Sequence, residues 1–269
     1  MVFALLTSGY GYMVSTPAMQ QQQQRSAALV MKVAQSRRYG ELATKVDKEK
    51  LYEPEEAVAL VKTLATAKFT ETIELHGNLN LDPKYNDQQI RTTVSLPAGT
   101  GNTVRVAVLA EGPAADAALA AGADLVGMAD LIETISSGVL DFDVLLATPP
   151  AMPKLAKLGK VLGPKGLMPS PKAGTVSADP GAAVAEFKAG KIEFRTDKQG
   201  IVHVPFGKSD FSVDDLEQNL ASLFDTIEKN RPTGCKGKLW NTAAICSTMG
   251  PAVKLDLAAL KLFTPKSAA

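Results

Sequence analysis

The residues that most often carry catalysis are scarce in this chain. Its two histidines, His76 and His203, lie on separate strand-like segments, and no nucleophile motif or metal-ligand spacing accompanies them. Each is therefore interpreted as an ordinary sheet histidine rather than a general base. Cys235 and Cys246 are the only cysteines, and they form neither a CxxC pair nor a Cys/His metal pattern. We expect reduced, packed thiols, no catalytic residue and no metal site.

Two glycine-rich segments match nucleotide-binding motifs only in part. Residues 99–104 read GTGNTV and begin like a dinucleotide fingerprint, but the third glycine is missing and the segment precedes its strand instead of following it. Near Gly159 and Gly163 the chain lacks the Gly-Lys-Ser/Thr spacing of a phosphate-binding loop. No cofactor is expected, and an enzyme is the least favoured of the functions considered.

Basic residues offer a different chemistry, the binding of a phosphate backbone. The segment from Gly159 to Val176 reads GKVLGPKGLMPSPKAGTV and holds three lysines but no acidic residue. Glycine frees the backbone, whereas proline fixes φ and removes an amide donor. Residues 163–174 are therefore predicted to form a shaped surface loop rather than a helix or a strand.

Charge is arranged in blocks although the net charge is only +1. Residues 144–191 hold seven basic against two acidic residues, and residues 229–254 hold no acidic residue. Such local fields steer a phosphate backbone whatever the total charge is. The alternative interpretation of any single lysine is a solvated surface residue. The basic residues of the second block are Lys229, Arg231, Lys236, Lys238 and Lys254.

The first 36 residues have the composition of a targeting segment. They contain Ser, Thr and Ala, a Gln20–Gln24 tract and no acidic residue. Because the first basic residue is Arg25, a plastid transit peptide is predicted rather than a secretory or mitochondrial address. The alternatives are a disordered extension or a true start at Met31. No run approaches the roughly 18 apolar residues of a membrane span, so no membrane partner is expected.

The elements that must position these residues follow two patterns. Apolar side chains recur with helical spacing after Pro54, and residues 72–81 and 90–96 alternate with period two, which predicts half-buried strands. Between residues 103 and 190, fully apolar strands alternate with helices, a pattern typical of a parallel sheet.

After residue 190 the alternating pattern returns. Residues 191–196 and 201–206 flank the turn at Asp197–Gly200 and predict a hairpin. Ser212 with Asp215 predicts the start of a further helix.

The fold class is therefore α/β, in two parts. A discontinuous α+β domain, with an antiparallel sheet and helices, is expected over residues 37–98 and 192–263. A Rossmann-like parallel α/β domain is inserted at residues 99–191, and residues 264–269 are a tail. The two crossings contain glycines that would permit hinge motion. The expected hinge residues are Gly99, Gly101 and Gly190.

Six blocks of sequence resemble the large-ribosomal-subunit protein L-one family in its bacterial form. They run in family order over roughly residues 37–257. The blocks are KFTETIEL (68–75), LDPKYNDQQIRTTVSLPAGTG (81–101), AAGADLVG (120–127), LLATPPAMPKLAKLGKVLGPKGLMPSPKAGTV (145–176), GKIEFRTDKQGIVHVPFGK (190–208) and CSTMGPAVKLD (246–256).

This resemblance implies a structural constituent of the large ribosomal subunit. Its partners would be the stalk of large-subunit rRNA and the deacylated tRNA that leaves the exit site, within a plastid ribosome or otherwise a bacterial-type cytoplasmic ribosome. The alternative is a translational repressor that binds its own messenger RNA. The discontinuous domain would hold the main RNA surface. The residues carried over by motif match are Lys68, Phe69, Glu71, Ser247, Thr248, Met249 and Gly250, followed with less weight by Asp197, Lys198, His203 and Lys208.

Several of these residues have a structural interpretation as well. Phe69 has the apolar parity of its strand, so periodicity alone favours the core. Glu71 is expected to orient Lys68 or to accept from a base or ribose hydroxyl, Ser247 and Thr248 to reach 2′-hydroxyls, and Gly250 to admit the RNA backbone. A secondary basic surface facing tRNA or neighbouring RNA is expected from Lys154, Lys157, Lys160, Lys165 and Lys172.

Overall fold

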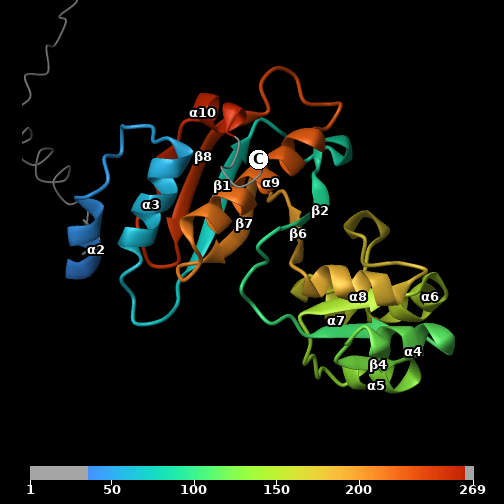
Figure 1. Ribbon diagram of the computed structural model, residues 1–269. Helices are drawn as coiled ribbons and strands as arrows, with labels where there is room; N and C mark the ends of the chain where they lie inside the picture. Colours follow the sequence, from blue (N-terminus) through green and yellow to red (C-terminus); the bar gives the residue numbers. More distant parts are fainter. Residues whose placement is uncertain (1–35, 264–269) are drawn as a thin grey trace, which may run out of the picture. The chain divides into compact units, whose positions relative to one another are not determined.

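The computed structural model describes residues 36–263 (Figure 1). A four-stranded antiparallel sheet has the order β7-β1-β8-β9. Its central strand β1 (Thr72–Leu79) pairs with β7 (Ile201–Lys208) and β8 (Trp240–Ser247), and β8 pairs with the short β9 (Val253–Leu255). Segments from both ends of the described chain therefore share one sheet.

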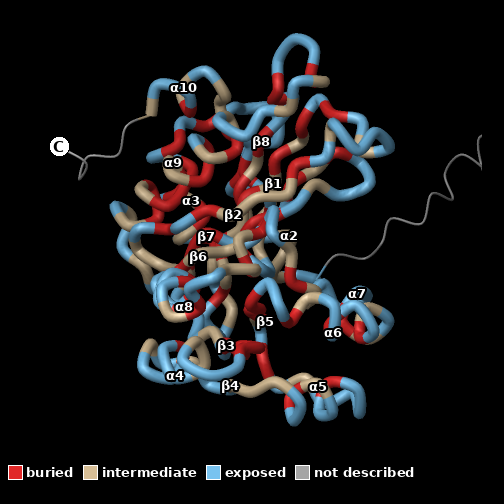
Figure 2. The backbone as a smooth tube through the Cα atoms, turned by 90° about the vertical axis from the view of Figure 1, so that its right-hand side faces the viewer, coloured by how far each residue is buried: buried red, intermediate tan, exposed pale blue. Residues whose placement is uncertain are grey.

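One face of this sheet is apolar and carries helices. Ile73, Leu75, Gly77 and Leu79 of β1 are buried, whereas the residues that alternate with them are half-buried, as the period-two pattern predicts (Figure 2). Their hydrophobic cluster includes side chains of α3 (Pro54–Leu64) and α9 (Val213–Lys229).

The helices of this part begin where the sequence predicts. Pro54 occupies the first turn of α3, and the Ser212 hydroxyl accepts a 3.1 Å hydrogen bond from the backbone N–H of Asp215 at the start of α9. The two short helices of this part are α2 (Arg37–Ala43) and α10 (Leu257–Leu262).

Trp240 packs against the backbone of β1. A Cβ added at Gly77 would lie 2.5 Å from Cζ3 of the Trp240 ring. The ring stacks on Phe224 with centroids 5.0 Å apart, and its Nε1 donates to Glu228 at 2.9 Å. Only glycine therefore fits at residue 77 beside this indole.

The predicted hairpin of residues 191–206 is wrong. Strand β6 (Lys191–Arg195) pairs antiparallel with β2 (Arg91–Ser95) in a separate two-stranded sheet, whereas β7 pairs with β1. Only the bridge between Thr196 and Val202 joins the two segments directly. The turn between them does form, but partners distant in sequence offer each strand a longer ladder than the other arm of the hairpin does.

The middle of the chain forms a three-stranded parallel sheet of order β4-β3-β5. All four residues of β3 (Val106–Leu109) are buried, as expected for a strand covered on both faces. The flanking strands are β4 (Leu125–Gly127) and β5 (Val144–Ala147), and the helices are α4 (Pro113–Ala120), α5 (Ala129–Ser136), α6 (Met152–Leu155), α7 (Gly159–Lys165) and α8 (Pro180–Lys188). Four 3₁₀ turns complete the described elements: η1 (Asn86–Gln88), η2 (Pro149–Ala151), η3 (Ala156–Leu158) and η4 (Pro171–Ala173).

The predicted loop over residues 163–174 is only partly correct. Helix α7 extends to Lys165 with Pro164 inside it and ends at Gly166, which has φ +74°. Buried Leu155, Leu158 and Leu162 continue one apolar face through this region. Burial of that face outweighs the local cost of proline near the end of the helix.

The two connections between the antiparallel and parallel sheets are tightly packed. Gly99 and Gly190 have φ values of +71° and +109°, and a Cβ at Gly190 would lie 2.6 Å from the Gly99 Cα. The fully buried Asn219 of α9 accepts from the Ala98 N–H at 3.1 Å and donates to the carbonyls of Gly99 at 3.0 Å and Phe206 at 2.8 Å. The positive φ of these glycines suits the expected hinge, whose motion stays a prediction.

The α/β fold class, with an antiparallel sheet and a parallel three-stranded sheet, is confirmed. The bounds of the two domains stay a prediction. The predicted transit peptide lies outside the described residues except for Ser36, and so does the tail at residues 264–269. Within the described part, no helix combines the length and apolarity that a membrane crossing requires.

Candidate nucleic-acid interface

Glu71 joins two loops at one end of the antiparallel sheet. One loop, residues 65–71, leads into β1, and the other, residues 248–252, connects β8 to β9. The Glu71 carboxylate is 1% exposed and accepts hydrogen bonds from the backbone N–H of Ala67 at 2.8 Å and of Met249 at 3.0 Å. Among the described residues no ion pair links Glu71 to Lys68, so the carboxylate shapes the two loops instead of orienting that lysine.

The surroundings of Glu71 keep it ionised. Burial by itself would raise the pKa of Glu71, but the backbone donors of Met249 and Ala67 outweigh it, and the net pKa is lowered. The hydroxyl of Ser247 and the guanidinium of Arg38 act in the same direction. The charge is therefore satisfied internally and does not face a phosphate.

Ser247 and Gly250 pack against each other beneath the second loop. Ser247 is 1% exposed, and its Oγ forms no hydrogen bond of good geometry with any described residue, although the hydroxyl lies close enough to the Glu71 carboxylate to lower the pKa of that group. A Cβ at Gly250 would approach that oxygen to 2.4 Å, so the hydroxyl occupies the space that the missing side chain leaves. Gly250 was expected to admit the RNA backbone. In the structure its missing side chain instead leaves room for the Ser247 hydroxyl inside the protein. At 1% exposure the hydroxyl faces the interior of the protein, where it acts on the Glu71 carboxylate.

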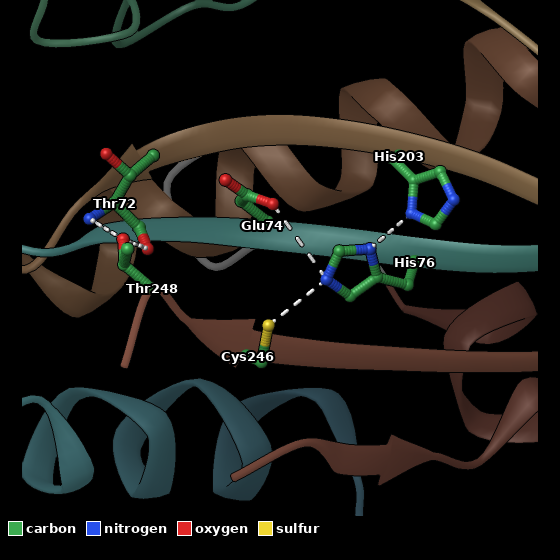
Figure 3. Close-up of polar contacts among 6 residues, drawn as sticks. All are labelled: Thr72, Glu74, His76, His203, Cys246 and Thr248. Carbon is green, nitrogen blue, oxygen red and sulfur yellow. Dashed lines mark hydrogen bonds and ion pairs between the residues drawn. The ribbon is translucent and has the colours of Figure 1, made fainter. Parts of the chain in front are cut away.

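Thr248 is bonded to the start of β1. Its hydroxyl accepts from the Thr72 N–H at 3.0 Å and lies 3.2 Å from the Thr72 carbonyl (Figure 3). Lys208 reaches the same corner, where its Nζ donates to the Thr72 hydroxyl at 3.3 Å. Thr248 was expected to reach a ribose hydroxyl, but in this structure it fastens two strands.

The two loops present large apolar side chains to solvent. Phe69 is 54% exposed and Met249 is 49% exposed. The interpretation of Phe69 as a core residue is wrong, because Phe69 lies in the bend before β1 and the buried alternation begins only at Glu71. Lys68 beside it is also exposed. An aromatic face, a flexible thioether and a cation together suit bases and phosphates.

The four residues given less weight do not lie together. Lys208 is at the corner formed by Thr72 and Thr248, whereas His203 lies midway along β7. Asp197 and Lys198 are exposed in the turn before β7, at the other end of the strand. A single surface at the Glu71 end therefore includes Lys208 but not Asp197 and Lys198.

His76 and His203, treated as unrelated in sequence, face each other across β1 and β7. Figure 3 shows the His76 ring between His203 and Cys246, with Nδ1 of His76 2.8 Å from Nδ1 of His203 and its Nε2 3.1 Å from the thiol sulfur. Burial, and then the neighbouring His203, lower the pKa of His76, and Glu74 opposes this; burial also raises the pKa of the Cys246 thiol. Across residues 36–263 no group of three such side chains is arranged to hold a metal ion.

The expected secondary basic surface is exposed. Lys154, Lys157 and Lys160 lie on the solvent side of α6, η3 and α7, opposite the buried leucines. Lys154 forms an ion pair with Glu111 at 2.9 Å, which reduces its local positive field. Lys165 and Lys172 are exposed farther along the same segment.

Arg38 is a site residue that the sequence did not indicate. Its Nη2 lies 3.5 Å from the Met249 carbonyl, and its charge helps to lower the pKa of Glu71. Arg38 lies in α2, far from either loop in sequence, and no pattern connects it to them.

Comparison with known proteins assigns most of the chain to one sequence family. A family model described as the ribosomal protein L1p/L10e family matches residues 60–251. The match covers the Glu71 loop, the parallel sheet and the segment from Ser247 to Gly250.

Individual relatives extend this match almost to their full length. A large ribosomal subunit protein uL1 from Synechococcus sp. (strain WH7803) is 58% identical over 226 residues, which is 84% of this chain and 96% of the relative. The protein of the same name from Trichodesmium erythraeum (strain IMS101) is 57% identical, with 84% and 94% covered. The one from Prochlorococcus marinus (strain MIT 9515) is 55% identical over 232 residues, with 86% and 98% covered.

Proposed function

The chain belongs to the ribosomal protein L1p/L10e family, and on this basis we propose that it is a structural constituent of the large ribosomal subunit. In this role it binds large-subunit rRNA at the mobile stalk and assists the release of deacylated tRNA from the exit site. The messenger-binding alternative stays a prediction.

The observation that carries the proposal is the arrangement of the two loops around Glu71. Phe69 and Met249 are exposed, whereas the carboxylate beneath them is buried and bonded to both loops. Single exposed apolar side chains are common, but exposed apolar side chains that gather at one place mark interaction sites, and Phe69 and Met249 lie on two loops that the same carboxylate joins. Nucleobases offer flat apolar surfaces to Phe69, and Lys68 and Lys208 can meet phosphates.

The proposal is tested by titrating the full chain against a fragment of the large-subunit stalk rRNA. Phe69→Ala combined with Met249→Ala should weaken binding at least about tenfold, because a single stacked base contributes about 1–3 kcal/mol. Both side chains are about half exposed, so thermal unfolding should change little.

A matched control removes exposed apolar side chains elsewhere. Leu119→Ala combined with Val139→Ala changes residues of 56% and 49% exposure in the parallel part of the protein. This variant should bind the fragment as the unmodified chain does. Equal affinity of the Phe69/Met249 variant and the control would reject the assignment of the site.

The five lysines of the secondary basic surface are proposed to face exit-site tRNA. Replacing Lys157, Lys160 and Lys165 with Gln should slow tRNA release from ribosomes that carry the variant, while affinity for the isolated stalk fragment stays unchanged. An unchanged release rate would exclude this surface from the tRNA path.

The chain is further proposed to work in a plastid ribosome. Its similarity to cyanobacterial uL1 proteins and the transit-peptide composition of residues 1–36 support this location. Sequencing the N-terminus of the protein from purified ribosomes tests it. A mature chain that begins at Met1 would contradict a cleaved transit peptide.

A further inference from the structure

A second group of unpaired cations lies at the end of the antiparallel sheet opposite Glu71. Strand β1 starts at Thr72 beside Thr248 and ends at Leu79 opposite Trp240. Eight residues of strand separate these ends by roughly 25 Å at about 3.3 Å per residue. The loops that follow Leu79 and precede Trp240 are therefore far from Phe69 and Met249.

These two loops pack together as one structure. The Asn80 side chain donates to the Lys236 carbonyl at 3.2 Å, and the Asn80 N–H donates to the Leu239 carbonyl at 2.7 Å. At Gly234 an added Cβ would lie 2.9 Å from the Asp87 carboxylate. Arg231 braces the second loop internally by donating to the Cys235 carbonyl at 3.2 Å.

The surface formed by this pair of loops and by Lys229, the last residue of α9, is basic and carries an aromatic ring. Among the described residues, none of its four lysines forms an ion pair, although Asp82 and Asp87 lie in the first loop. The Asp82 carboxylate accepts from the backbone N–H of Lys84 at 3.2 Å instead. Tyr85 is 59% exposed. The far-end basic surface consists of Lys84, Tyr85, Lys229, Lys236 and Lys238.

We propose that the far-end basic surface is a second RNA-binding surface, separate from the one at Glu71. Unpaired lysines on a braced loop suit a phosphate backbone, and an exposed ring beside them suits an unstacked base or a ribose. Gly237 adds open backbone, because a Cβ there would meet nothing within 4 Å. The surface contacts RNA mainly through charge and without sequence preference, because its four lysines meet phosphates, which carry no sequence information.

The inference rests on the proposed function only in taking RNA as the partner. The salt dependence of the affinity for RNA tests it. The full chain is titrated between about 50 and 200 mM salt against two probes: the stalk rRNA fragment and a duplex RNA hairpin of unrelated sequence. In the variant Lys229→Gln/Lys236→Gln/Lys238→Gln, the slope of log affinity against log salt should fall by about 2, because each lost phosphate contact removes about 0.7–0.9. Tyr85→Ala should lower affinity about fivefold or more without changing the slope.

The control variant Lys45→Gln/Lys48→Gln/Lys261→Gln removes the same number of charges from exposed lysines elsewhere. It should keep the slope of the unmodified chain on both probes. Equal slopes in the two triple variants would overturn the inference. A far-end variant that binds both RNAs normally but fails to enter ribosomes would indicate an acidic protein partner, and would overturn it as well.

The same titration distinguishes the two proposals. If the unmodified chain does not prefer the stalk fragment to the unrelated hairpin, the proposed function fails. The far-end surface is then still judged by the slopes measured on the unrelated hairpin.

Discussion

At the scale of single residues, hydrogen bonding decides which polar groups are available to RNA. Glu71, Thr248 and Gly250 each have a role inside the protein: one braces two loops, one fastens two strands and one makes room for a hydroxyl. Phe69, Met249 and Lys68 are exposed beside them. A surface that binds RNA tightly needs both the internally bonded residues and the exposed ones. The bonded residues hold the loops rigid, so the exposed side chains lose little conformational entropy on binding.

Glu71→Gln should lower the free energy of unfolding by about 1–3 kcal/mol, because two backbone donors lose a charged acceptor. The folded-state pKa of Glu71 is lowered, so the stability that it contributes is present above the ordinary glutamate pKa of about 4.3 and is lost as pH falls through the folded pKa. Chemical denaturation from pH 6 down to about pH 3 measures this. The exposed Glu49→Gln is the control, and an acid dependence equal in Glu71→Gln and wild type would contradict the argument.

The facing histidines predict a second pH effect. Two Nδ1 atoms 2.8 Å apart accommodate one proton between them, so protonation of both rings is disfavoured. The pKa of His76 is lowered, and the stability it contributes is therefore full above the ordinary histidine pKa of about 6.5 and declines as pH falls toward the folded value. NMR titration of the folded chain measures the pKa of His76 directly, because the chain has only two histidines.

His203→Asn should raise the pKa of His76, because it removes the electrostatic effect of His203 that lowers this pKa, while a polar side chain remains. Cys246→Ser is the control variant, because Cys246 contacts the other nitrogen of the His76 ring. In this variant His203 should still lower the pKa of His76. A His76 pKa unchanged by His203→Asn would show that burial alone is responsible.

At the scale of elements, close packing sets which residues each strand tolerates. Trp240 lies against Gly77 and stacks on Phe224, and Glu228 holds its indole nitrogen. The ring therefore fixes β8, β1 and α9 together. In the sequence Trp240 occupies an ordinary strand position, but in the structure it links all three of these elements.

Gly77→Ala should destabilise the fold by about 1–3 kcal/mol, because the added Cβ overlaps a ring that Phe224 and Glu228 hold in place. Gly40→Ala in α2 is the matched control, since nothing lies within 4 Å of its added Cβ. The control should gain up to about 1 kcal/mol from the helical preference of alanine over glycine. Urea denaturation of both variants checks the prediction, and similar stabilities would refute it.

At the scale of the whole molecule, the connections between the antiparallel and parallel sheets depend on one buried amide. Asn219 bonds Ala98, Gly99 and Phe206, and Gly190 packs on Gly99 with no room for a side chain. Glycines supply the backbone conformations at the crossings, and Asn219 restricts one of them. Motion of the expected hinge at Gly99 would act directly on the hydrogen bonds of Asn219.

Asn219→Ala should cost about 2–3 kcal/mol, because it leaves buried backbone groups without partners. The amide of Ala98 should also exchange its hydrogen faster, which distinguishes loosening of this connection from a general loss of stability. The exposed Asn230→Ala is the control and should cost less than about 1 kcal/mol. Unchanged exchange at Ala98 would show that the connection is held by other contacts.

Periodicity in the sequence determined several of the elements, because helical and strand spacing follow directly from which side chains must be buried. It predicted the helix after Pro54, the buried face of β1 and the Ser212 cap, and the L-one motifs indicated the family. It did not determine that β6 pairs with β2, that α7 continues through Pro164, or that Phe69 is exposed.

Only the tertiary structure decided those points, and it also brought together the groups that no sequence spacing connects. Glu71 with Met249, His76 with His203, and Asn219 with Gly99 are each more than a hundred residues apart. Such contacts depend on which distant strands pair and in what register, and local preferences carry no information on that choice.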